Sequence, residues 1–211
     1  MIDAIRKLFA PLIDFIVMLI SKVVWKPTST LSDADKAKIS ELLKKDYYVI
    51  CTRHSNYLST YVIGFMNLLL TGRFGYYSHV LMNLEDSVTA IDDFRLLEAT
   101  TKGVKYSTFD EVFGKASGVC LLKPVDMTLA EWTSTLDAAK TYLGRPYDTL
   151  YDLANDQQLS CVELVRDVLK ASPDYATDFA NFEKSILKSK NLAPQMFRDC
   201  QDFEVVLEIK R

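Results

Sequence analysis

The chain has 211 residues, of which 49% are hydrophobic, 7 are glycine and 6 are proline. This length and composition predict one globular domain with a sizeable core, and they exclude a chain of low complexity. The formal net charge of −3 comes from 25 basic and 28 acidic residues without any block of Lys or Arg, which argues against a nucleic-acid-binding surface.

The chain begins with an apolar segment, residues 1–25, on which polar residues recur at nearly heptad spacing. These residues are Asp3, Lys7, Asp14 and Ser21, and they draw one narrow polar stripe along a predicted helix. A membrane span is disfavoured because it would bury Asp14 in mid-bilayer, at a cost of about 2.5 kcal/mol or more. Two alternatives stay open: the helix packs on the protein's own body, or it lies on a membrane surface or a partner protein.

A cleavable signal peptide is also a poor fit to residues 1–25. The start of the segment is not cleanly basic, and no small-residue cleavage site follows it. We therefore expect a protein that is cytoplasmic or peripheral at a membrane. Its expected organisation is an apolar amphipathic helix over 1–25 followed by one domain over 26–211.

The domain is predicted to mix helices and strands, as in the α+β class. Ser32, with an acidic residue three positions later, predicts the start of a short surface helix, and the apolar stretch 57–72 predicts a core helix that ends at Gly72. Further helices are expected over 128–144, over the stretch 157–169 that contains Cys161, and near 176–190. Strands are expected over 47–52, 77–84, 94–100, 103–107, 118–124 and 203–209. The four strands between residues 77 and 124 suggest an antiparallel meander.

The four cysteines, Cys51, Cys120, Cys161 and Cys200, are widely separated in the sequence. They are too sparse for a secreted disulfide scaffold, and their spacing matches neither a CxxC motif nor a Cys/His zinc site. We expect free thiols in a reducing compartment and no metal ligands among them.

Most familiar catalytic signatures are absent from the sequence. It contains no P-loop, no GxGxxG, no GxSxG and no HExxH motif, so the phosphate-cradling and metallo-hydrolase classes lose most of their support. His54 and His79 are the only histidines. Any site that uses an imidazole therefore draws on this pair.

Cys161 lies at the start of an amphipathic helix, directly after a polar turn. The unpaired N–H groups and the positive dipole end of a helix N-terminus favour the thiolate form of a cysteine, and the same N–H groups can hold an oxyanion. The alternative is that Cys161 is a small hydrophobe that packs with Val162, Leu164 and Val165. Position alone leaves both interpretations open.

Two further residues are candidates for the same site. His79 lies on the predicted strand 77–84, which is a rigid mount for a base, although a strand histidine can also be purely structural and His54 is a rival. Glu98 is a carboxylate in the otherwise apolar strand 94–100, so it needs a partner. An imidazole that faced Glu98 would be held in one tautomer, and its charged form would be favoured.

Four stretches, taken in order, resemble the circularly permuted branch of the NlpC-type papain-fold cysteine hydrolases, the YiiX-like proteins. The stretches are YYSHVLMNL (76–84), LLEATTKGVKYSTFDEVF (96–113), GRPYDTLYDLANDQQLSCVELVRDVL (144–169) and LAPQMFRDCQDFEVV (192–206). The resemblance covers roughly residues 45–209. In this family a Ser-His-Val strand comes first and a Cys-Ser-Glu-Leu-Val helix comes last, which reverses the Cys-then-His order of the unpermuted relatives.

The resemblance implies a role for each candidate residue. Cys161 would be the nucleophile, His79 the general base and Glu98 the residue that orients His79. Val162 stands where the family commonly has serine, a mild departure that keeps the position of the thiol. Glu163 would be a recurrent helix residue rather than a catalyst. Tyr147 and Asp148 match the family's Tyr-Asp pair before the cysteine helix, without an assigned role.

The implied fold is a permuted papain-like α+β domain, in which an antiparallel sheet packs against the helix that carries the nucleophilic cysteine. The implied function is that of a thiol hydrolase or acyltransferase that cleaves an amide or ester bond through an acyl-enzyme. It needs no metal and no organic cofactor. Related branches act on peptides of murein stems or on fatty-acyl groups, and the apolar segment 1–25 is compatible with a lipid substrate or a substrate near a membrane.

Two alternatives from other functional classes stay open. The chain could be a catalytically inactive member of the same fold that serves as a binding or membrane-associated module. It could also be a structural or assembly protein anchored by residues 1–25. Selective reaction of Cys161 with a thiol reagent would separate the enzyme from both.

Overall fold

The computed structural model describes residues 29–54, 60–61, 63–64, 67–68, 74–83, 94–148, 157–189 and 192–211. The helix expected over 1–25 lies outside these residues, as does most of the helix expected over 57–72, of which residues 60–61, 63–64 and 67–68 are helical. Within the described part of the chain, no helix is long and apolar enough to cross a membrane.

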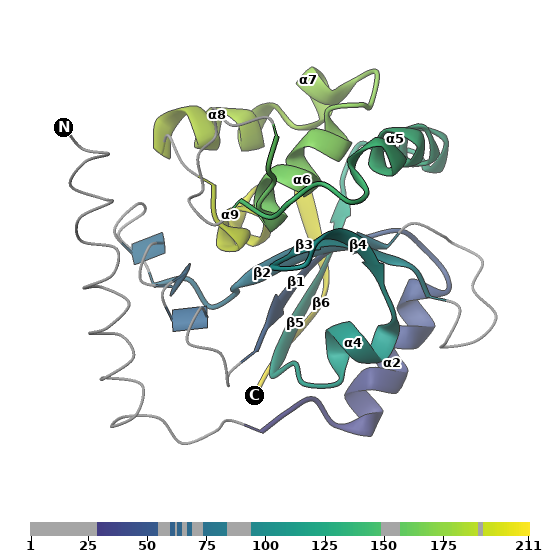
Figure 1. Cartoon of the computed structure of the whole chain (residues 1–211), viewed down its shortest axis with the longest axis vertical. Helices are drawn as coiled ribbons and strands as arrows, with labels where there is room; N and C mark the ends of the chain where they lie inside the picture. The colour runs from purple at the N-terminus through teal and green to yellow at the C-terminus, as the bar shows by residue number, and fades with distance from the viewer. Residues whose placement is uncertain are drawn as a thin grey trace.

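A six-stranded antiparallel sheet forms the centre of the molecule (Figure 1). Its strands are β1 (Val49–Arg53), β2 (His79–Asn83), β3 (Leu96–Thr100), β4 (Gly103–Ser107), β5 (Gly118–Pro124) and β6 (Phe203–Lys210). The strand order is β4-β3-β2-β1-β5-β6, and every neighbouring pair is antiparallel. The expected meander therefore holds from β2 to β4, whereas β5 returns to lie beside β1.

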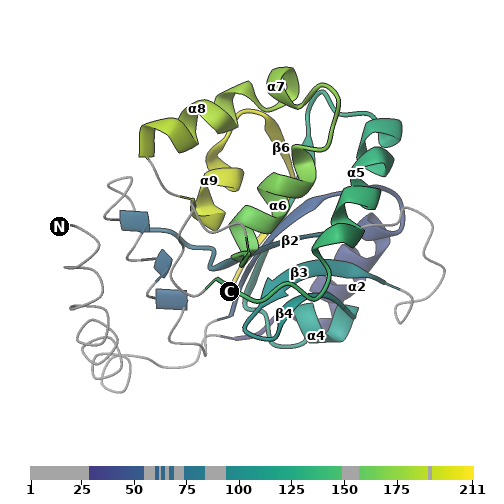
Figure 2. The same ribbon diagram turned by 45° about the horizontal axis from the view of Figure 1, so that its top comes forward.

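Helices cover both faces of the sheet (Figures 1 and 2). Five of them, α5 (Leu129–Tyr142), α6 (Cys161–Leu169), α7 (Tyr175–Asp178), α8 (Ala180–Ser189) and α9 (Pro194–Asp199), lie on one face. The other face carries α2 (Asp33–Leu43) and α4 (Phe109–Phe113). The single helix expected near 176–190 is divided into α7 and α8, and neither α4 nor α9 was expected from the sequence.

The helix starts follow a common pattern of local hydrogen bonds. In α2, α4, α5 and α6 a serine or threonine at the N-cap accepts a bond from the backbone three residues later, and an acidic residue at that position bonds back to the N-cap. Each such capping box satisfies two backbone N–H groups that the helix itself leaves without an acceptor. The capping box predicted at Ser32 is confirmed.

The apolar core consists of two clusters, one on each side of the sheet. Val80 and Met82 of β2 belong to the cluster beneath α5 and α6, where they are buried with Trp132 and Leu164. Leu81 belongs to the opposite cluster, beneath α2 and α4. This alternation is the one that a strand with both faces covered requires. The α+β fold class expected from the sequence is confirmed.

The short segment 145–146 bridges β4 and the residues just before α6 through two backbone hydrogen bonds. The N–H of Val104 on β4 donates to the carbonyl of Arg145 at 2.9 Å, and the N–H of Leu159 donates to the carbonyl of Pro146 at 3.0 Å. Gly103 has a φ of +93°, and a Cβ there would lie 2.7 Å from the Arg145 carbonyl oxygen, so glycine suits both the backbone and the close approach. The segment thereby connects the β3–β4 hairpin to the residues just before α6.

Candidate functional site

The structure brings the three predicted site residues together from three elements. His79 is the first residue of β2, Glu98 lies in the middle of β3, and Cys161 is the first residue of α6. The His79 Nε2 atom lies 2.7 Å from Glu98 Oε2, and the Cys161 side chain lies close enough to the imidazole to raise the pKa of His79. The result is a thiol, an imidazole and a carboxylate in contact in that order.

The packing of α6 on the sheet explains why these side chains meet. The helix packs against β2 and β3, and its apolar residues are part of the core on that face. β2 and β3 pair at Met82 with Leu97 and at Asn83 with Leu96, which is the end of β2 away from His79. The start of α6 is thus held against the strands that carry His79 and Glu98.

The first turn of α6 is fixed by a buried capping box. The backbone N–H and the hydroxyl of Ser160 both donate to Glu163 Oε2, at 2.8 Å and 2.6 Å, and the Glu163 N–H donates to Ser160 Oγ at 3.4 Å. Burial raises the pKa of the Glu163 carboxyl above its usual value, against the hydrogen bonds from Ser160, which lower it. Glu163 therefore orders the helix that begins at Cys161.

Glu98 is a buried carboxylate with three donor groups around it. Besides His79, the Ser107 hydroxyl donates to Glu98 Oε1, and the Lys105 ammonium lies 3.8 Å from the same oxygen. Burial opposes the charge, but the hydrogen bonds from His79 and Ser107 and the charges of His79 and Lys105 together hold the pKa of Glu98 well below its usual value. The carboxylate is therefore ionised at neutral pH.

His79 is correspondingly favoured in its cationic form. Burial alone would lower the pKa of the imidazole, but hydrogen bonds with the Cys161 and Glu98 side chains, and the negative charge that each can carry, raise it well above the usual value. An imidazolium placed between a thiol and a carboxylate can stabilise a thiolate and can return its proton to a leaving group.

His54, the rival base, lies close to the site but differs from His79 in its protonation state. Burial and the positive charge of His79 lower the pKa of His54 to about 4, so it is neutral at pH 7. Its ring also makes a hydrogen bond with the backbone of Lys115. His79 rather than His54 makes the described contact with Cys161.

The other cysteines are buried free thiols in surroundings that disfavour ionisation. Burial raises the pKa of Cys51 well above its usual value and raises the pKa of both Cys120 and Cys200 to about 12. Cys161 is buried as well, with 2% of its surface exposed, but it alone among the four contacts an imidazole within the described residues. This contact distinguishes Cys161 chemically from the other three thiols.

Two residues that hold Glu98, Lys105 and Ser107, were not found from the sequence. The turn at residues 101–102 joins β3 to β4 and sets the register in which Glu98 lies directly opposite Lys105. Opposite charges at directly paired positions of a hairpin favour a salt bridge. The sequence could therefore have predicted the Glu98–Lys105 pair once the β3–β4 hairpin was recognised. Ser107 lies two residues further along β4, within reach of the same carboxylate.

The Tyr-Asp pair before α6 is buried or partly buried. Asp148 is buried, and its charge contributes to the raised pKa of Glu163. Tyr147 is partly buried against the core beneath α6. Among the residues that the structure describes, no three His, Cys, Asp or Glu side chains are grouped so that they could hold a metal ion.

Comparison with known proteins identifies the family. A family model of permuted papain-like amidase enzymes, the C92 family of YaeF and YiiX, matches residues 50–208. The chain belongs to this family. The C92 match confirms the resemblance seen in the sequence, and the antiparallel sheet and helices described above have the permuted papain-like arrangement.

A solved structure supports the fold of this C92-family protein. The crystal structure of the metalloprotein YiiX from Escherichia coli O157:H7 is similar, with a TM-score of 0.57 over 80% of this chain and 99% of that chain. The two sequences are 18% identical, so the likeness shows the fold alone. A search of curated proteins gives no match.

Proposed function

We propose that this protein is a cysteine amidase in which Cys161 is the nucleophile, His79 the general base and Glu98 the residue that orients His79. Membership of a family of permuted papain-like amidases supports the reaction class. The observation that carries the assignment is the chain of contacts from the Cys161 thiol through His79 to Glu98, with 2.7 Å between Nε2 and Oε2. A base within reach of a thiol, oriented by a third group, is the arrangement that nucleophilic catalysis requires.

The reaction would proceed in two stages. Because Nε2 of His79 is bonded to Glu98, the other ring nitrogen, Nδ1, takes the proton of the Cys161 thiol. The thiolate attacks the carbonyl carbon, and the backbone N–H of Cys161, which has no acceptor within its own helix, stabilises the oxyanion. The leaving amine or alcohol then receives the proton from His79, and a thioester on Cys161 remains.

The second stage regenerates the enzyme. His79 removes a proton from a water molecule, which attacks the thioester carbonyl. The acid product leaves, and the proton returns to the Cys161 sulfur, directly or through His79. An amine in place of water would complete an acyl transfer. Glu98 stays ionised throughout, since it keeps its bonds to His79 and Ser107 in each step.

The substrate would be an amide or ester, with a peptide or a lipid-like molecule as the two sources that the sequence suggests. The similar E. coli protein is described as a metalloprotein. The residues described here do not offer a group of metal ligands, and the steps above are those that the chain's own side chains perform.

Capture of the acyl-enzyme tests this function. The protein is mixed with 4-nitrophenyl acetate, quenched in acid and digested, and the acetylated peptide is located by mass spectrometry. We expect one acetyl group on Cys161, none on Cys161→Ala, and an unchanged yield on Cys200→Ala as the matched control. Acetylation of another residue, or of none, would point to the non-catalytic binding module.

A further inference from the structure

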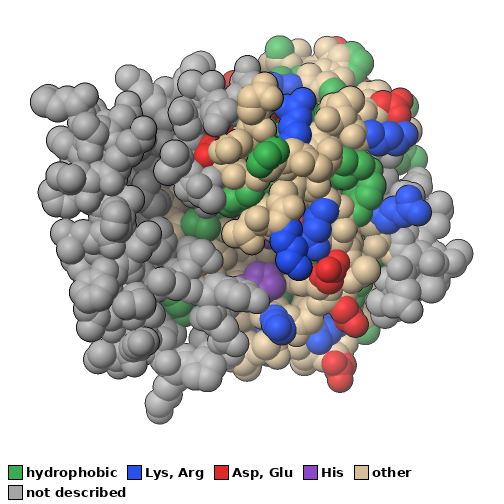
Figure 3. Space-filling view, viewed as in Figure 1, with side chains coloured by type: hydrophobic (Ala, Val, Ile, Leu, Met, Phe, Trp, Pro, Cys, Tyr) green, Lys and Arg blue, Asp and Glu red, His purple; other side chains and the backbone are tan. Residues whose placement is uncertain are grey.

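The position of the His79 imidazole depends on the backbone that leads into β2. His79 is the first residue of β2, and it pairs with Thr52 of β1. Within the described residues, β3 pairs with β2 only from Met82 onward. The His79 side chain is 18% exposed, and a histidine reaches the surface among Lys and Arg side chains in Figure 3. Since neither a second strand nor complete burial holds His79, its place depends on how residues 76–78 are anchored.

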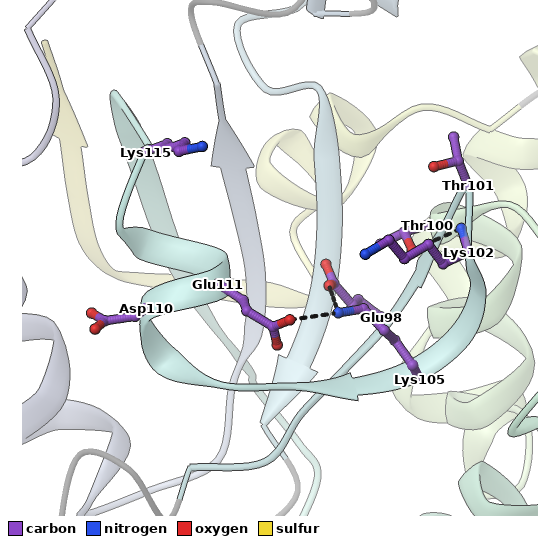
Figure 4. A pocket seen from close by; sticks show the side chains of 8 residues that line it. All are labelled: Glu98, Thr100, Thr101, Lys102, Lys105, Asp110, Glu111 and Lys115. Atoms are coloured by element: carbon purple, nitrogen blue, oxygen red, sulfur yellow. Dashed lines mark hydrogen bonds and ion pairs between the residues drawn. The ribbon is translucent and has the colours of Figure 1, made fainter.

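The carboxylate that faces the imidazole is fixed separately, by the β3–β4 hairpin and α4. Glu98 accepts from the Ser107 hydroxyl, and it lies 3.8 Å from the Lys105 ammonium. Lys105 in turn donates to Glu111 at 3.1 Å, and Figure 4 shows both interactions of its ammonium group. A shift at the start of β2 would therefore move the imidazole relative to a carboxylate that stays in place.

The side chain of Gln195, on α9, holds the backbone just before His79. Gln195 Oε1 accepts from the N–H of Tyr76 at 3.0 Å and from that of Tyr77 at 3.5 Å. Gln195 Nε2 donates to Asp199 Oδ1 at 3.0 Å. Only this orientation of the amide matches donors with acceptors, because a backbone N–H cannot accept a hydrogen bond and an ionised carboxylate cannot donate one.

A buried arginine holds the same segment from the other side. Arg53, at the end of β1, donates from Nη1 to the Tyr76 carbonyl at 2.8 Å, and its guanidinium lies 4.7 Å from the centre of the Tyr76 ring. Arg53 is 8% exposed and makes no ion pair with another described residue. Both backbone groups of Tyr76 are thus bonded to side chains of other elements, and the N–H of Ser78 donates to the Thr52 carbonyl at 3.0 Å.

The helix that carries Gln195 is itself well anchored. Phe197 of α9 is fully buried, and its ring centre lies 4.4 Å from that of Phe182 on α8. Arg198 donates to both carboxylate oxygens of Glu208 on β6, at 3.1 Å each. The Tyr77 hydroxyl donates to the same carboxylate at 2.8 Å. The segment before β2 is therefore joined to α9 directly through Gln195 and indirectly through Glu208.

We propose that Gln195 is a positioning residue for His79, because its amide ties α9 to the backbone from which the base projects. Gln195 bonds to this backbone rather than to the reacting groups, so it acts on catalysis through the place of the imidazole. The inference rests on the proposed function, in which His79 is the base that serves Cys161. It predicts that loss of the bond changes the ionisation of Cys161 as well as the stability of the fold.

The test replaces Gln195 by alanine, which removes the acceptor and keeps a good helix former in α9. Alkylation of Cys161 by iodoacetamide is measured in the full chain as a function of pH, and urea unfolding is measured on the same proteins. We expect alkylation at mildly acidic pH to slow about tenfold and the midpoint of the pH profile to rise by about one unit, because a displaced imidazolium stabilises the thiolate less. A residue that supports the fold alone would lower the free energy of unfolding and leave this midpoint unchanged.

A paired exchange provides a rescue. Gln195→Glu combined with Asp199→Asn keeps an acceptor for the two backbone N–H groups and reverses donor and acceptor in the bond between the two side chains. The net charge stays the same. Alkylation of Cys161 in this double variant should return to within about threefold of the wild-type rate, with the midpoint restored.

Asn181→Ala is the matched control. The Asn181 amide on α8 donates to Asp202 at 2.7 Å and likewise joins a helix to a distant part of the chain. Its loss should lower stability to a similar degree and leave the pH midpoint unchanged.

The outcomes separate this inference from the proposed function. If Gln195→Ala lowers stability alone, as Asn181→Ala does, or if the paired exchange does not restore the pH profile, the positioning role is wrong and the proposed function stands. If wild-type Cys161 reacts no faster than the other three thiols, the proposed function fails and this inference fails with it.

Discussion

At the scale of single residues, the site depends on one buried carboxylate that keeps its charge. Glu98 is 7% exposed, and an isolated carboxylate at that depth would be costly. Contacts with His79, Ser107 and Lys105 offset this cost and leave the negative charge directed at the imidazole. The raised pKa of His79 is in part the consequence of that charge.

Replacement of each histidine tests which imidazole serves Cys161. His79→Ala removes the group in contact with the thiol, so selective alkylation of Cys161 by iodoacetamide near neutral pH should fall by about tenfold or more. His54→Ala is the matched control, since His54 is neutral at that pH, and it should change the rate by less than about twofold. Alkylation rates measured by peptide mass spectrometry decide between the two histidines. If the rate fell more in His54→Ala than in His79→Ala, His54 would be the base that serves Cys161.

Glu98→Gln tests the orienting carboxylate, because it keeps the shape of the side chain and removes the charge. The imidazolium of His79 loses its counter-ion, so we expect turnover to fall by about 10²-fold, which is less than the loss for Cys161→Ala. The fold should survive at neutral pH. Steady-state kinetics with an activated ester measure the change, and an unaltered rate would make Glu98 a purely structural residue.

We also predict how the loss of stability in Glu98→Gln depends on pH. The lowered pKa of Glu98 stabilises the fold above the usual value of 4.5, and this contribution is lost as the pH falls through the lowered value. The raised pKa of His79 stabilises the fold fully below 6.5, and its contribution is lost as the pH rises through the raised value. Urea unfolding should therefore show the largest difference between wild type and Glu98→Gln between pH 4.5 and 6.5, by about 1 to 3 kcal/mol. A difference that is equally large at pH 3 would contradict this assignment.

The sequence singled out the three candidate site residues but not the residues that support Glu98, for a physical reason. Only Glu98 breaks the pattern of an otherwise apolar strand, and Cys161 and His79 are ordinary by themselves, so it was the order of the motifs and the family resemblance that singled out the three residues together. Lys105 and Ser107 lie on a strand where polar residues are ordinary. Their importance depends on the register of the β3–β4 hairpin, and that register is fixed by the two-residue turn and by the approach of Gly103 to Arg145.

At the scale of elements, the start of α6 positions the thiol. The buried capping box of Ser160 and Glu163 orders the first turn, and the packing of α6 against β2 and β3 places Cys161 beside these strands. Helices with this local signal, such as α2 and α5, were predicted well from the sequence. The five-residue α4 carries the same signal but is too short for a periodic pattern, and the six-residue α9 has no side-chain hydrogen bond at its N-cap, so neither was predicted.

Ser160→Ala tests this positioning role. Loss of the N-cap hydroxyl should lower the free energy of unfolding by about 1 to 2 kcal/mol and should slow the alkylation of Cys161 about threefold or more. Thr128→Ala removes the equivalent cap of α5, far along the chain from the thiol, and should lower stability to a similar degree with no effect on alkylation. Urea unfolding and alkylation rates provide the two measurements. Equal alkylation rates in both variants would show that the cap serves stability alone.

At the scale of the whole molecule, the position of β5 could not be read from the sequence. A strand that follows β4 can extend the meander or return to the other side of β1, and both choices bury the same apolar residues. The structure takes the second choice, which places β1 in the interior of the sheet between β2 and β5. The permuted order of His79 before Cys161 is compatible with this topology, because a site needs its groups close in space and in no particular order along the chain.

Removal of residues 1–25 tests the role expected for the apolar N-terminal segment. We expect the shortened chain to stay soluble and folded, and the full chain to bind lipid vesicles in a sedimentation assay when the shortened chain does not. Light scattering and circular dichroism check the first expectation. Aggregation of the shortened chain would instead show that the segment covers part of the protein's own core.

Alkylation of the wild-type protein at mildly acidic pH tests the central claim most directly. At pH 5 an ordinary cysteine, with a pKa of about 8.5, is ionised in roughly one molecule in 3000, and burial depresses ionisation of Cys51, Cys120 and Cys200 further. A thiol paired with an imidazolium escapes this limit. Iodoacetamide at pH 5, followed by peptide mass spectrometry, should modify Cys161 and leave the other three thiols intact. If all four cysteines react together, or only after unfolding, Cys161 is not an activated nucleophile and the proposed amidase function is wrong.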